Sequence, residues 1–374
     1  MDNNVVLEGN FPLKKERDSN FELYRIIMLL IIAHHYFVNS GLTLLPEINE
    51  FTARNAFLWV FGGYGKTGIN CFVLLTGYFM CKSQITLSKF LKLLLQIEFY
   101  RIVFYIVFLI MGYETFSVLR ILKVLIPITS VKQNFTECYL LFFLCIPFLN
   151  ILVKNMSEKM HIRLLLIVVF AYVFIGTIPG AGVSMNYVSW YVVLYFISSY
   201  VRLHPKKIFD NTLLWGIMSL LLLALSAISI LVCLKIGKGM YFLLSDSNKA
   251  LALSIAVSTF MFFKNVKIKN SKAINLLAST TFGVFLIHAN SEAMRIWLWK
   301  NVLKNVEIYN SQWLYIHALL SPIIIFLVCS VIDMARIFLL EKPFFKWWNK
   351  REEKIVDLYK RTEDKICKKT GIGD

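Results

Sequence analysis

The sequence lacks the short motifs that identify most soluble enzymes. It contains no Walker-type phosphate loop, no dinucleotide-binding glycine fingerprint following a strand and no Gly-x-Ser-x-Gly nucleophile turn. ATP, NAD and serine-hydrolase chemistry therefore have no residues to support them. The seven cysteines include no Cys-x-x-Cys pair, and the histidines are not clustered at metal-ligand spacing. We predict no disulfide bond, no metal site and no bound cofactor.

Acidic residues are scarce relative to basic ones. There are 23 Asp and Glu against 40 Lys and Arg, which gives a formal net charge of +17. Such an excess is also found in nucleic-acid-binding proteins, but their basic surface needs a solvated domain, and the apolar runs leave no room for one. We therefore expect no nucleic acid partner. The first twenty residues contain Lys14, Lys15 and Arg17 and no apolar stretch, so they do not predict a cleavable signal peptide.

Apolar surface is what the sequence has in abundance. Apolar residues make up 57% of the chain and aromatic residues 15%, which is more than one soluble core could bury. Apolar runs able to cross about 30 Å of hydrocarbon recur from end to end. The sequence therefore predicts an all-α, polytopic membrane helix bundle of about ten transmembrane helices. The predicted spans are 21–39, 56–80, 91–111, 137–153, 162–178, 188–202, 211–234, 249–263, 273–290 and 312–340.

The distribution of basic residues predicts the orientation of these spans. If the N-terminus is cytoplasmic, the inner segments and the tail hold 26 Lys and Arg residues, whereas the outer segments hold nine. Basic residues concentrate on the cytoplasmic side of membrane proteins. We therefore expect both termini in the cytoplasm.

Two segments fall outside the ten spans. The apolar stretch 117–129 is too short to cross and is predicted to be an interfacial or re-entrant segment on the outer side. The chain divides into a transmembrane domain over residues 1–341 and a basic cytoplasmic tail over residues 342–374.

The first span carries the most informative polar residues. Glu22 and Arg25 are three residues apart, so they share a helix face and can form an ion pair. His34 and His35 follow, with His35 about 15 Å deeper than Arg25. An imidazole at that depth can act as a general base or as a nucleophile. The alternative is that the two histidines only bond to neighbouring helices and hold them together.

Two later segments also place polar residues in spans. Gly65, Gly68 and Gly77 allow the second span to approach the first closely, as ordinary helix packing also would. Lys66 lies among them, where an unpaired ammonium would be costly. His288 ends the ninth predicted span, near the outer face, where a structural role is the alternative to a functional one.

These segments together resemble the acyltransferase 3 family of multispanning bacterial O-acyltransferases, and the resemblance runs through nearly the whole chain. Members of that family open with an Arg and, after ten intervening residues, a His. Here nine residues separate Arg25 from His35. Ten steps of an ideal helix leave the two side chains about 80° apart, so matching the family pattern requires either a local helix irregularity or a different partner for His35. The other segments that resemble the family are 65–79, 139–150, 190–202 and 281–288.

The resemblance implies the activity and the roles of the residues. It implies an acyl-CoA donor, expected to be acetyl-CoA, on the cytoplasmic side, and a hydroxyl of a cell-surface polysaccharide or lipid-linked glycan as the acceptor. His35 or His34 would be catalytic. The substrate-binding residues would be Arg25, Glu22, Lys66 and His288.

Two other functions use many-span proteins with buried polar residues. A transporter or flippase for a lipid-linked sugar would often show paired, interrupted spans from internal duplication, which are not visible in this sequence. A polysaccharide polymerase or ligase would be expected to have a long outer loop with several Arg and His residues, whereas the outer loops predicted here are short. Acyl transfer distinguishes the acyltransferase from both.

Overall fold

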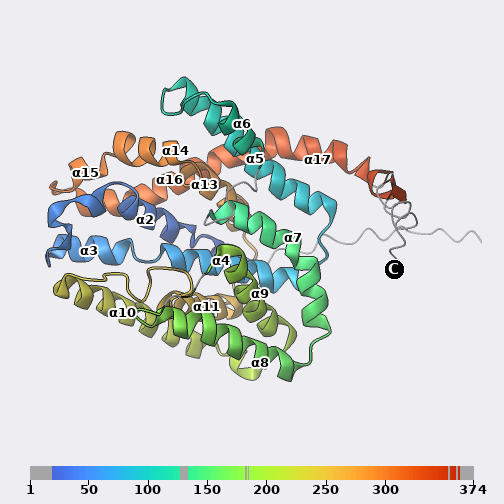
Figure 1. Cartoon of the computed structure of the whole chain (residues 1–374), viewed down its shortest axis with the longest axis horizontal. Helices are drawn as coiled ribbons and strands as arrows, with labels where there is room; N and C mark the ends of the chain where they lie inside the picture. Colours follow the sequence, from blue (N-terminus) through green and yellow to red (C-terminus); the bar gives the residue numbers. More distant parts are fainter. Residues whose placement is uncertain are drawn as a thin grey trace, which may run out of the picture.

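The computed structural model of the chain describes residues 19–126, 134–181, 183, 185–352, 354–358 and 361–362. These residues form helices and connecting loops, with no strand among them (Figure 1). The α-helices are α1 (Ser19–Arg25), α2 (Met28–Val38), α3 (Ala53–Phe61), α4 (Gly65–Met80), α5 (Leu87–Ile110), α6 (Val118–Leu125), α7 (Phe135–Lys154), α8 (Glu158–Val169), α9 (Tyr187–Leu203), α10 (Thr212–Ile236), α11 (Ala250–Asn265), α12 (Lys272–Ser279), α13 (Thr281–His288), α14 (Glu292–Ile296), α15 (Asn305–Ile308), α16 (Leu314–Arg336) and α17 (Lys342–Trp348).

Shorter helical turns join or extend these helices. The 3-10 turns are η1 (Leu42–Leu44), η2 (Pro46–Asn49) and η4 (Lys207–Asp210), and the π-helical turns are η3 (Phe170–Ile175), η5 (Trp297–Val302) and η6 (Ile337–Glu341).

Several helices are long and apolar enough to cross a membrane. Among the described residues there are five such stretches, namely Ser19–Leu44, Leu87–Ile110, Phe135–Lys154, Thr212–Ile236 and Leu314–Trp348. A sixth is possible if Lys272–His288 and Glu292–Ile308, which meet at a bend of 90°, form one broken span. The predicted all-helical class is therefore confirmed, and the long apolar helices support the predicted membrane location. Helices overlie all ten predicted ranges, but the count of ten and the side of the termini stay predictions.

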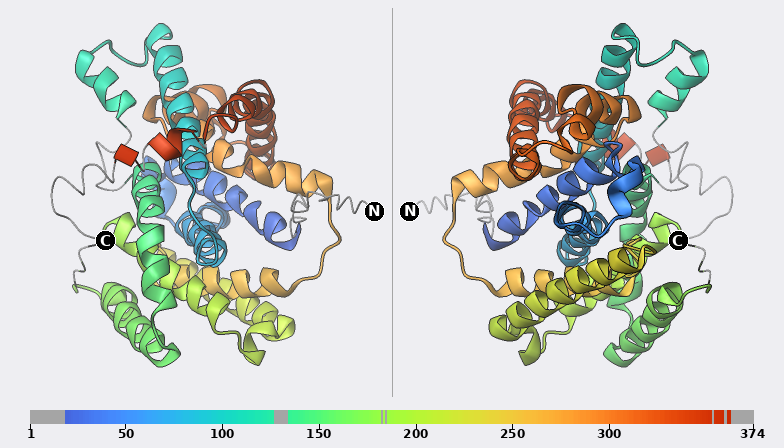
Figure 2. Two further views of the ribbon diagram at one scale, coloured as in Figure 1. Left: turned by 90° about the vertical axis from the view of Figure 1, so that its right-hand side faces the viewer. Right: turned by 90° about the vertical axis from the view of Figure 1, so that its left-hand side faces the viewer.

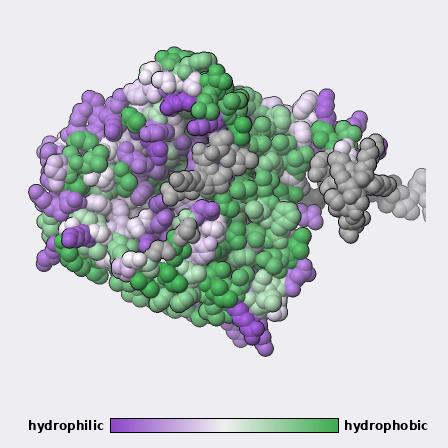
Figure 3. All heavy atoms as spheres, viewed as in Figure 1, coloured by the Kyte–Doolittle hydropathy of each residue, from purple (hydrophilic) through white to green (hydrophobic). Residues whose placement is uncertain are grey.

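The bundle is built around α4. This helix packs against α2, α9 and α11, while α10 covers α11 and α16 covers α2 and α13. The views along the other axis show α4 enclosed by its neighbours (Figure 2). The outer helices present apolar side chains outward, such as Leu213 and Leu220 of α10. The space-filling view shows a broad apolar surface beside a hydrophilic end (Figure 3), as expected for a protein in contact with lipid.

Glycines of α4 permit the close packing that the sequence predicted, but not all toward the same helix. A Cβ on Gly65 would lie 2.3 Å from the His34 ring, and one on Gly68 would lie 2.6 Å from Ile31, so both glycines face α2 as expected. Gly77 instead faces α9, where a Cβ would lie 2.2 Å from the Ser198 hydroxyl oxygen. The prediction that Gly77 faces the first helix was wrong, because α4 leaves α2 as it continues and comes to lie against α9.

The short helix α6 stands apart from the bundle (Figures 1 and 2). It has eight residues, none of them buried, and it contacts α5. Eight residues rise only about 12 Å, so α6 cannot cross a bilayer. Residues 127–129 of the predicted interfacial segment lie outside the described part of the chain, and the side of the membrane on which α6 lies stays a prediction.

At the C-terminal end, α16, η6 and α17 continue from one into the next as far as Trp348. The predicted boundary between residues 341 and 342 falls within this helical stretch. The Trp348 indole N–H donates to the Ser88 hydroxyl at 3.1 Å, which ties α17 to the start of α5.

Candidate active site

The first helix contains the irregularity that the Arg25–His35 spacing requires. Between α1 and α2, four backbone amides, from Ile26, Ile27, Leu29 and Leu30, bond to carbonyls three residues earlier, at 2.9–3.0 Å. A 3-10 turn advances about 120° per residue, compared with about 100° in an α-helix. Four such residues add about 80° of rotation. This overwinding equals the mismatch predicted for nine intervening residues, and it turns His35 back toward the side of Arg25.

Glu22 and Arg25 form the predicted ion pair at the start of this helix. Arg25 Nε lies 3.4 Å from Glu22 Oε2, and the two side chains are 27% and 12% exposed. The pair is thus sheltered by the bundle, and the guanidinium still reaches its surface. Its other N–H donors make no hydrogen bond within the described part of the chain, so they are available to a ligand there.

Three histidines meet at the other end of α2 and form what we call the histidine cluster, His34, His35 and His288. The His35 ring centroid lies 5.8 Å from that of His34 and 5.5 Å from that of His288. His288 is the last residue of α13 and is fully buried. His34 and His35 are partly exposed, so the cluster is open from the side of α2.

Backbone carbonyls orient two of these rings. His34 Nδ1 lies 2.6 Å from the carbonyl oxygen of Gly62, which the break between α3 and α4 leaves outside a helix. His288 Nδ1 lies 2.6 Å from the carbonyl oxygen of Val284. A carbonyl can only accept, so each neutral ring carries its proton on Nδ1 and a lone pair on Nε2. The His288 Nε2 is buried and has no hydrogen-bond partner in the described part of the chain.

The third ring, His35, is oriented by a side chain one turn ahead on the same helix. Its Nδ1 contacts the side-chain amide nitrogen of Asn39. In this orientation Asn39 donates and the neutral His35 ring carries its proton on Nε2. A half-turn of the amide group would present its oxygen instead, so that Nδ1 donates and Nε2 holds the lone pair. Asn39 therefore controls which nitrogen of His35 is available for chemistry.

Lys66 lies next to this cluster and is paired. Its ammonium donates to the Tyr187 hydroxyl at 2.5 Å and lies 3.6 Å from Asp246 Oδ1. Asn70, one turn further along α4, donates to the Ser247 carbonyl at 2.7 Å and accepts from the Trp190 indole at 2.8 Å. These contacts hold the loop before α11 and the start of α9 beside the histidine cluster. The sequence pointed to Lys66 but not to its partners.

The structure thus brings four of the six predicted residues together. His34, His35, His288 and Lys66 gather at one end of the first helix pair, whereas Glu22 and Arg25 lie at the other. No group of three or more His, Cys, Asp or Glu side chains arranged to hold a metal ion occurs among the residues that the structure describes.

A family model for an acyltransferase domain matches residues 25–333, most of the chain. The chain belongs to the acyltransferase 3 family. The matched range includes Arg25, both first-helix histidines, Lys66 and His288, and the predicted resemblance is confirmed. No curated protein and no solved structure is significantly similar to the chain. Membership of the acyltransferase 3 family, together with the apolar helices, indicates a membrane acyltransferase.

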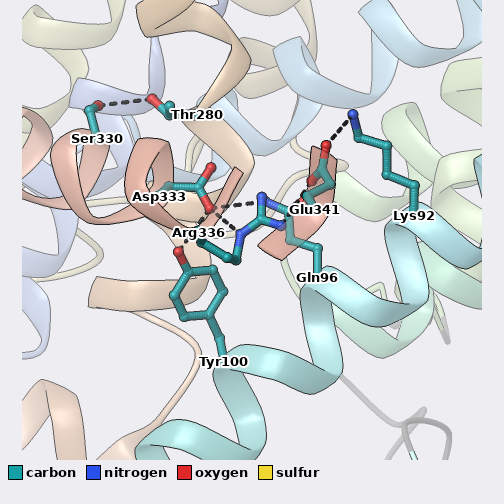
Figure 4. Close-up of polar contacts among 8 residues, drawn as sticks. All are labelled: Lys92, Gln96, Tyr100, Thr280, Ser330, Asp333, Arg336 and Glu341. Carbon is teal, nitrogen blue, oxygen red and sulfur yellow. Dashed lines mark hydrogen bonds and ion pairs between the residues drawn. The ribbon is translucent and has the colours of Figure 1, made fainter. Parts of the chain in front are cut away.

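Sequence reasoning missed a second polar centre of this acyltransferase 3 chain. We call it the charge network, and it consists of Lys92, Asp333, Arg336 and Glu341 (Figure 4). Arg336 Nε lies 2.7 Å from Asp333 Oδ1, and Arg336 Nη1 lies 2.8 Å from Glu341 Oε2. Glu341 also pairs with Lys92 of α5 at 2.6 Å. The available signal was Asp333 and Arg336, oppositely charged and three residues apart inside a predicted span.

Sequence reasoning also missed a charged cleft beside α6. The cleft has a volume of about 200 Å³ and is lined by Arg101, Tyr105, Glu114, Arg120, Lys123, Val124 and Glu137. Arg101 of α5 pairs with Glu137 of α7 at 3.2 Å. Thr136, next to Glu137, contacts the Asn290 side chain, two residues after His288. The cleft therefore lies at the same end of the bundle as the histidine cluster.

Proposed function

We propose that this protein transfers an acyl group, acetyl in the first instance, from acyl-CoA to a hydroxyl of an envelope or exported polysaccharide or glycolipid. The observation that carries the proposal is the packing of the His35 ring against the His288 ring, 5.5 Å apart, within a member of the acyltransferase 3 family. His35 can supply the base that acyl transfer to a hydroxyl needs. Its neighbour His288 has a buried Nε2 without a hydrogen-bond partner in the described part of the chain.

In the proposed reaction His35 removes the proton of the acceptor hydroxyl while the oxygen attacks the thioester carbonyl. The C–S bond breaks, and the CoA thiolate takes up the proton from the imidazolium. His35 acts with the Asn39 amide oxygen turned toward Nδ1, which leaves its Nε2 lone pair free. A variant of this route forms an acyl-His35 intermediate before the acceptor attacks. His34 supports the ring of His35 or takes its place as base.

The donor is proposed to approach from the cytoplasmic side, at the end of the first helix that holds Arg25 and Glu22. Arg25 retains free N–H donors for a CoA phosphate, and the predicted inner segments are rich in Lys and Arg. The uncharged pantetheine arm would enter the bundle, because burying a phosphate there would cost far more than burying an amide.

The acceptor is proposed to approach from the opposite, outer side. Lys66 and His288 would contact it at the histidine end, and the cleft with Arg101 and Glu137 offers donors and acceptors for sugar hydroxyls at that same end. The protein would then work in a bacterial cytoplasmic membrane with both termini inside, and would move the acyl group across the bilayer.

Labelled acetyl-CoA and membrane vesicles of both orientations test this function. Inside-out vesicles should transfer label from external acetyl-CoA to glycan, and right-side-out vesicles should do so only when acetyl-CoA is loaded within. Equal use of external acetyl-CoA by both kinds of vesicle would contradict transfer across the bilayer. No transfer by either kind would instead favour the transporter or the polymerase. In cells, deletion of the protein should remove O-acetyl signals from the NMR spectrum of the surface glycan.

A further inference from the structure

The side chain of Asp333 occupies the space that a side chain at position 283 would need. A Cβ built on Gly283 would lie 2.1 Å from Asp333 Cγ, and 2.3 and 2.4 Å from its two carboxylate oxygens. Ordinary contacts to a Cβ are 3.4–4 Å. Only glycine fits here, and α13 can therefore lie directly against the Asp333 carboxylate of α16.

Neighbouring helices hold that carboxylate in place (Figure 4). Asp333 is fully buried, and its Oδ1 accepts from the Tyr100 hydroxyl at 2.8 Å, from Arg336 Nε at 2.7 Å and from Gln96 Nε2 at 3.5 Å. Tyr100 and Gln96 belong to α5. The carboxylate is therefore fixed from both α5 and α16, and it cannot move away from α13 without breaking these bonds.

The charge balance of the network indicates a fixed structure rather than a ligand site. Its two carboxylates are matched by two cations, and each charge has an opposite partner within 2.8 Å. No charge is left over to attract a substrate. Asp333 Oδ2 is buried and has no hydrogen-bond partner among the described residues. The rigidity of the network therefore rests on its three ion pairs and on the hydrogen bonds to Asp333 Oδ1.

The helix that Asp333 contacts is short and separate from its neighbours. α13 has eight residues; it follows α12 after Thr280 and is followed by the 90° bend toward α14. A second contact at its start joins the Thr280 hydroxyl to the Ser330 hydroxyl at 3.0 Å. Gly283 and Thr280 thus attach the start of α13 to α16, and His288 stands at its other end.

We propose that Asp333 is a positioning residue for the histidine cluster, acting through Gly283 and the rigid helix α13. His288 lies five residues after Gly283, about 7.5 Å further along the helix axis. A displacement at Gly283 is therefore passed to the His288 ring and changes its contact with His35. The catalytic consequence rests on the proposed function, whereas the positioning itself does not.

The size of the effect follows from the geometry. A methyl group at position 283 must move more than 1 Å from the Asp333 carboxylate to reach an ordinary contact distance. A misplacement of about 1 Å in reacting groups lowers rates about 100-fold. Gly283→Ala should therefore lower kcat for acyl transfer about 100-fold and leave KM for acyl-CoA unchanged. A mere loss of folded protein would scale the total activity without changing kcat per folded molecule.

A cross-linking experiment measures the position of His288 without relying on activity. In the full-length chain carrying His35→Cys and His288→Cys, a short thiol-specific cross-linker should join residues 35 and 288, and mass spectrometry of the linked peptides identifies the product. Adding Gly283→Ala should slow this reaction at least tenfold. The matched control is Gly216→Ala in α10, where the added Cβ would lie 3.2 Å from the Phe262 ring, and it should leave the rate unchanged.

A rescue variant keeps the proposal open to refutation if Gly283→Ala folds poorly. Gly283→Ala combined with Asp333→Ala removes the carboxylate that the new methyl group meets. Cross-linking should then be at least threefold faster than with Gly283→Ala alone. Equal cross-linking rates with and without Gly283→Ala, or no rescue in the double variant, would overturn the proposal. Slowed cross-linking with an unchanged rate of acyl transfer would support the positioning and refute the catalytic role of the histidine pair.

Discussion

The histidine cluster and the charge network lie at the two ends of one short helix, and of these two centres the charge network alone is built from opposite charges in contact. At the end of α13, His288 Nε2 is buried with no hydrogen-bond partner among the described residues, and carbonyl oxygens orient the rings of His34 and His288. Near its start, Asp333, Arg336, Glu341 and Lys92 each have an oppositely charged partner. A reactive centre needs available lone pairs, whereas a centre that holds helices together is strongest when its charges are matched.

The largest effect on acyl transfer is expected at the histidine cluster. His35→Ala should lower acyl transfer at least about 100-fold, the low end of what general-base catalysis contributes. Loss of one partly exposed imidazole should leave the protein inserted and folded, which size-exclusion chromatography in detergent checks. His34→Ala should lower transfer less, because His34 contacts the Gly62 carbonyl and points about 100° away around the helix. Full activity in both variants would place catalysis elsewhere.

At the charge network the expected effect is on the stability of the folded protein. Arg336→Met removes the cation that joins Asp333 to Glu341 and leaves a buried carboxylate without its ion-pair partner. Breaking a buried pair in this way costs about 3–5 kcal/mol in soluble proteins. The thermal unfolding midpoint in detergent should fall clearly. Lys304→Met removes an exposed pair with Glu307 and should leave the midpoint in place. Equal midpoints for both variants would show that the network does not hold the helices.

A smaller effect is expected at the residue that orients His35. Asn39→Leu removes the hydrogen-bonding partner of His35 Nδ1 and should lower kcat about tenfold, equivalent to one hydrogen bond of about 1.4 kcal/mol. Asn39→Asp keeps an oxygen that can accept from Nδ1 and should retain most of the activity. Comparing the kcat values of the two variants tests whether an oxygen at position 39 accepts from His35 Nδ1. An active Asn39→Leu beside an inactive Asn39→Asp would contradict the proposed orientation.

At the donor side the expected effect is confined to binding. Arg25→Ala should raise KM for acyl-CoA about tenfold, as expected for the loss of one charge-assisted hydrogen bond, while KM for the glycan changes less than twofold. Arg54→Ala is the matched control, because Arg54 bonds to Asn310 at an exposed position outside the predicted donor path. A larger change in KM for the glycan than for acyl-CoA would move Arg25 to the acceptor side.

The smallest effect is expected from reporter fusions, which leave the active-site residues unchanged and report on which side of the membrane each fusion point lies. Reporter fusions after Lys92, Lys207 and Lys272 should all report the cytoplasm, because the basic residues concentrate in those segments. Lys92 belongs to the charge network, so the fusion after it also locates that network relative to the membrane. A periplasmic signal at any of the three sites would break the ten-span topology.

Local relations were predictable from the sequence. The apolar runs determined a helical membrane protein, and the three-residue spacing of Glu22 and Arg25 determined an ion pair. The Arg25–His35 spacing required a helix irregularity, which the 3-10 turn supplies. The ion pair and the helix irregularity both involve residues within a few turns of one helix. Over that distance the helical geometry alone determines which side chains are neighbours.

Contacts between distant helices were decided by the tertiary structure. His35 meets His288, Gly283 meets Asp333, and Gly77 turns to α9 rather than to the first helix. Helices such as α10 and α16 are apolar nearly all round, because lipid covers the faces that water would cover in a soluble protein. The pattern of apolar residues in these helices therefore does not indicate which face packs against the rest of the bundle and which faces lipid. Which residues meet depends on close packing at crossings, and only the assembled bundle determines those crossings.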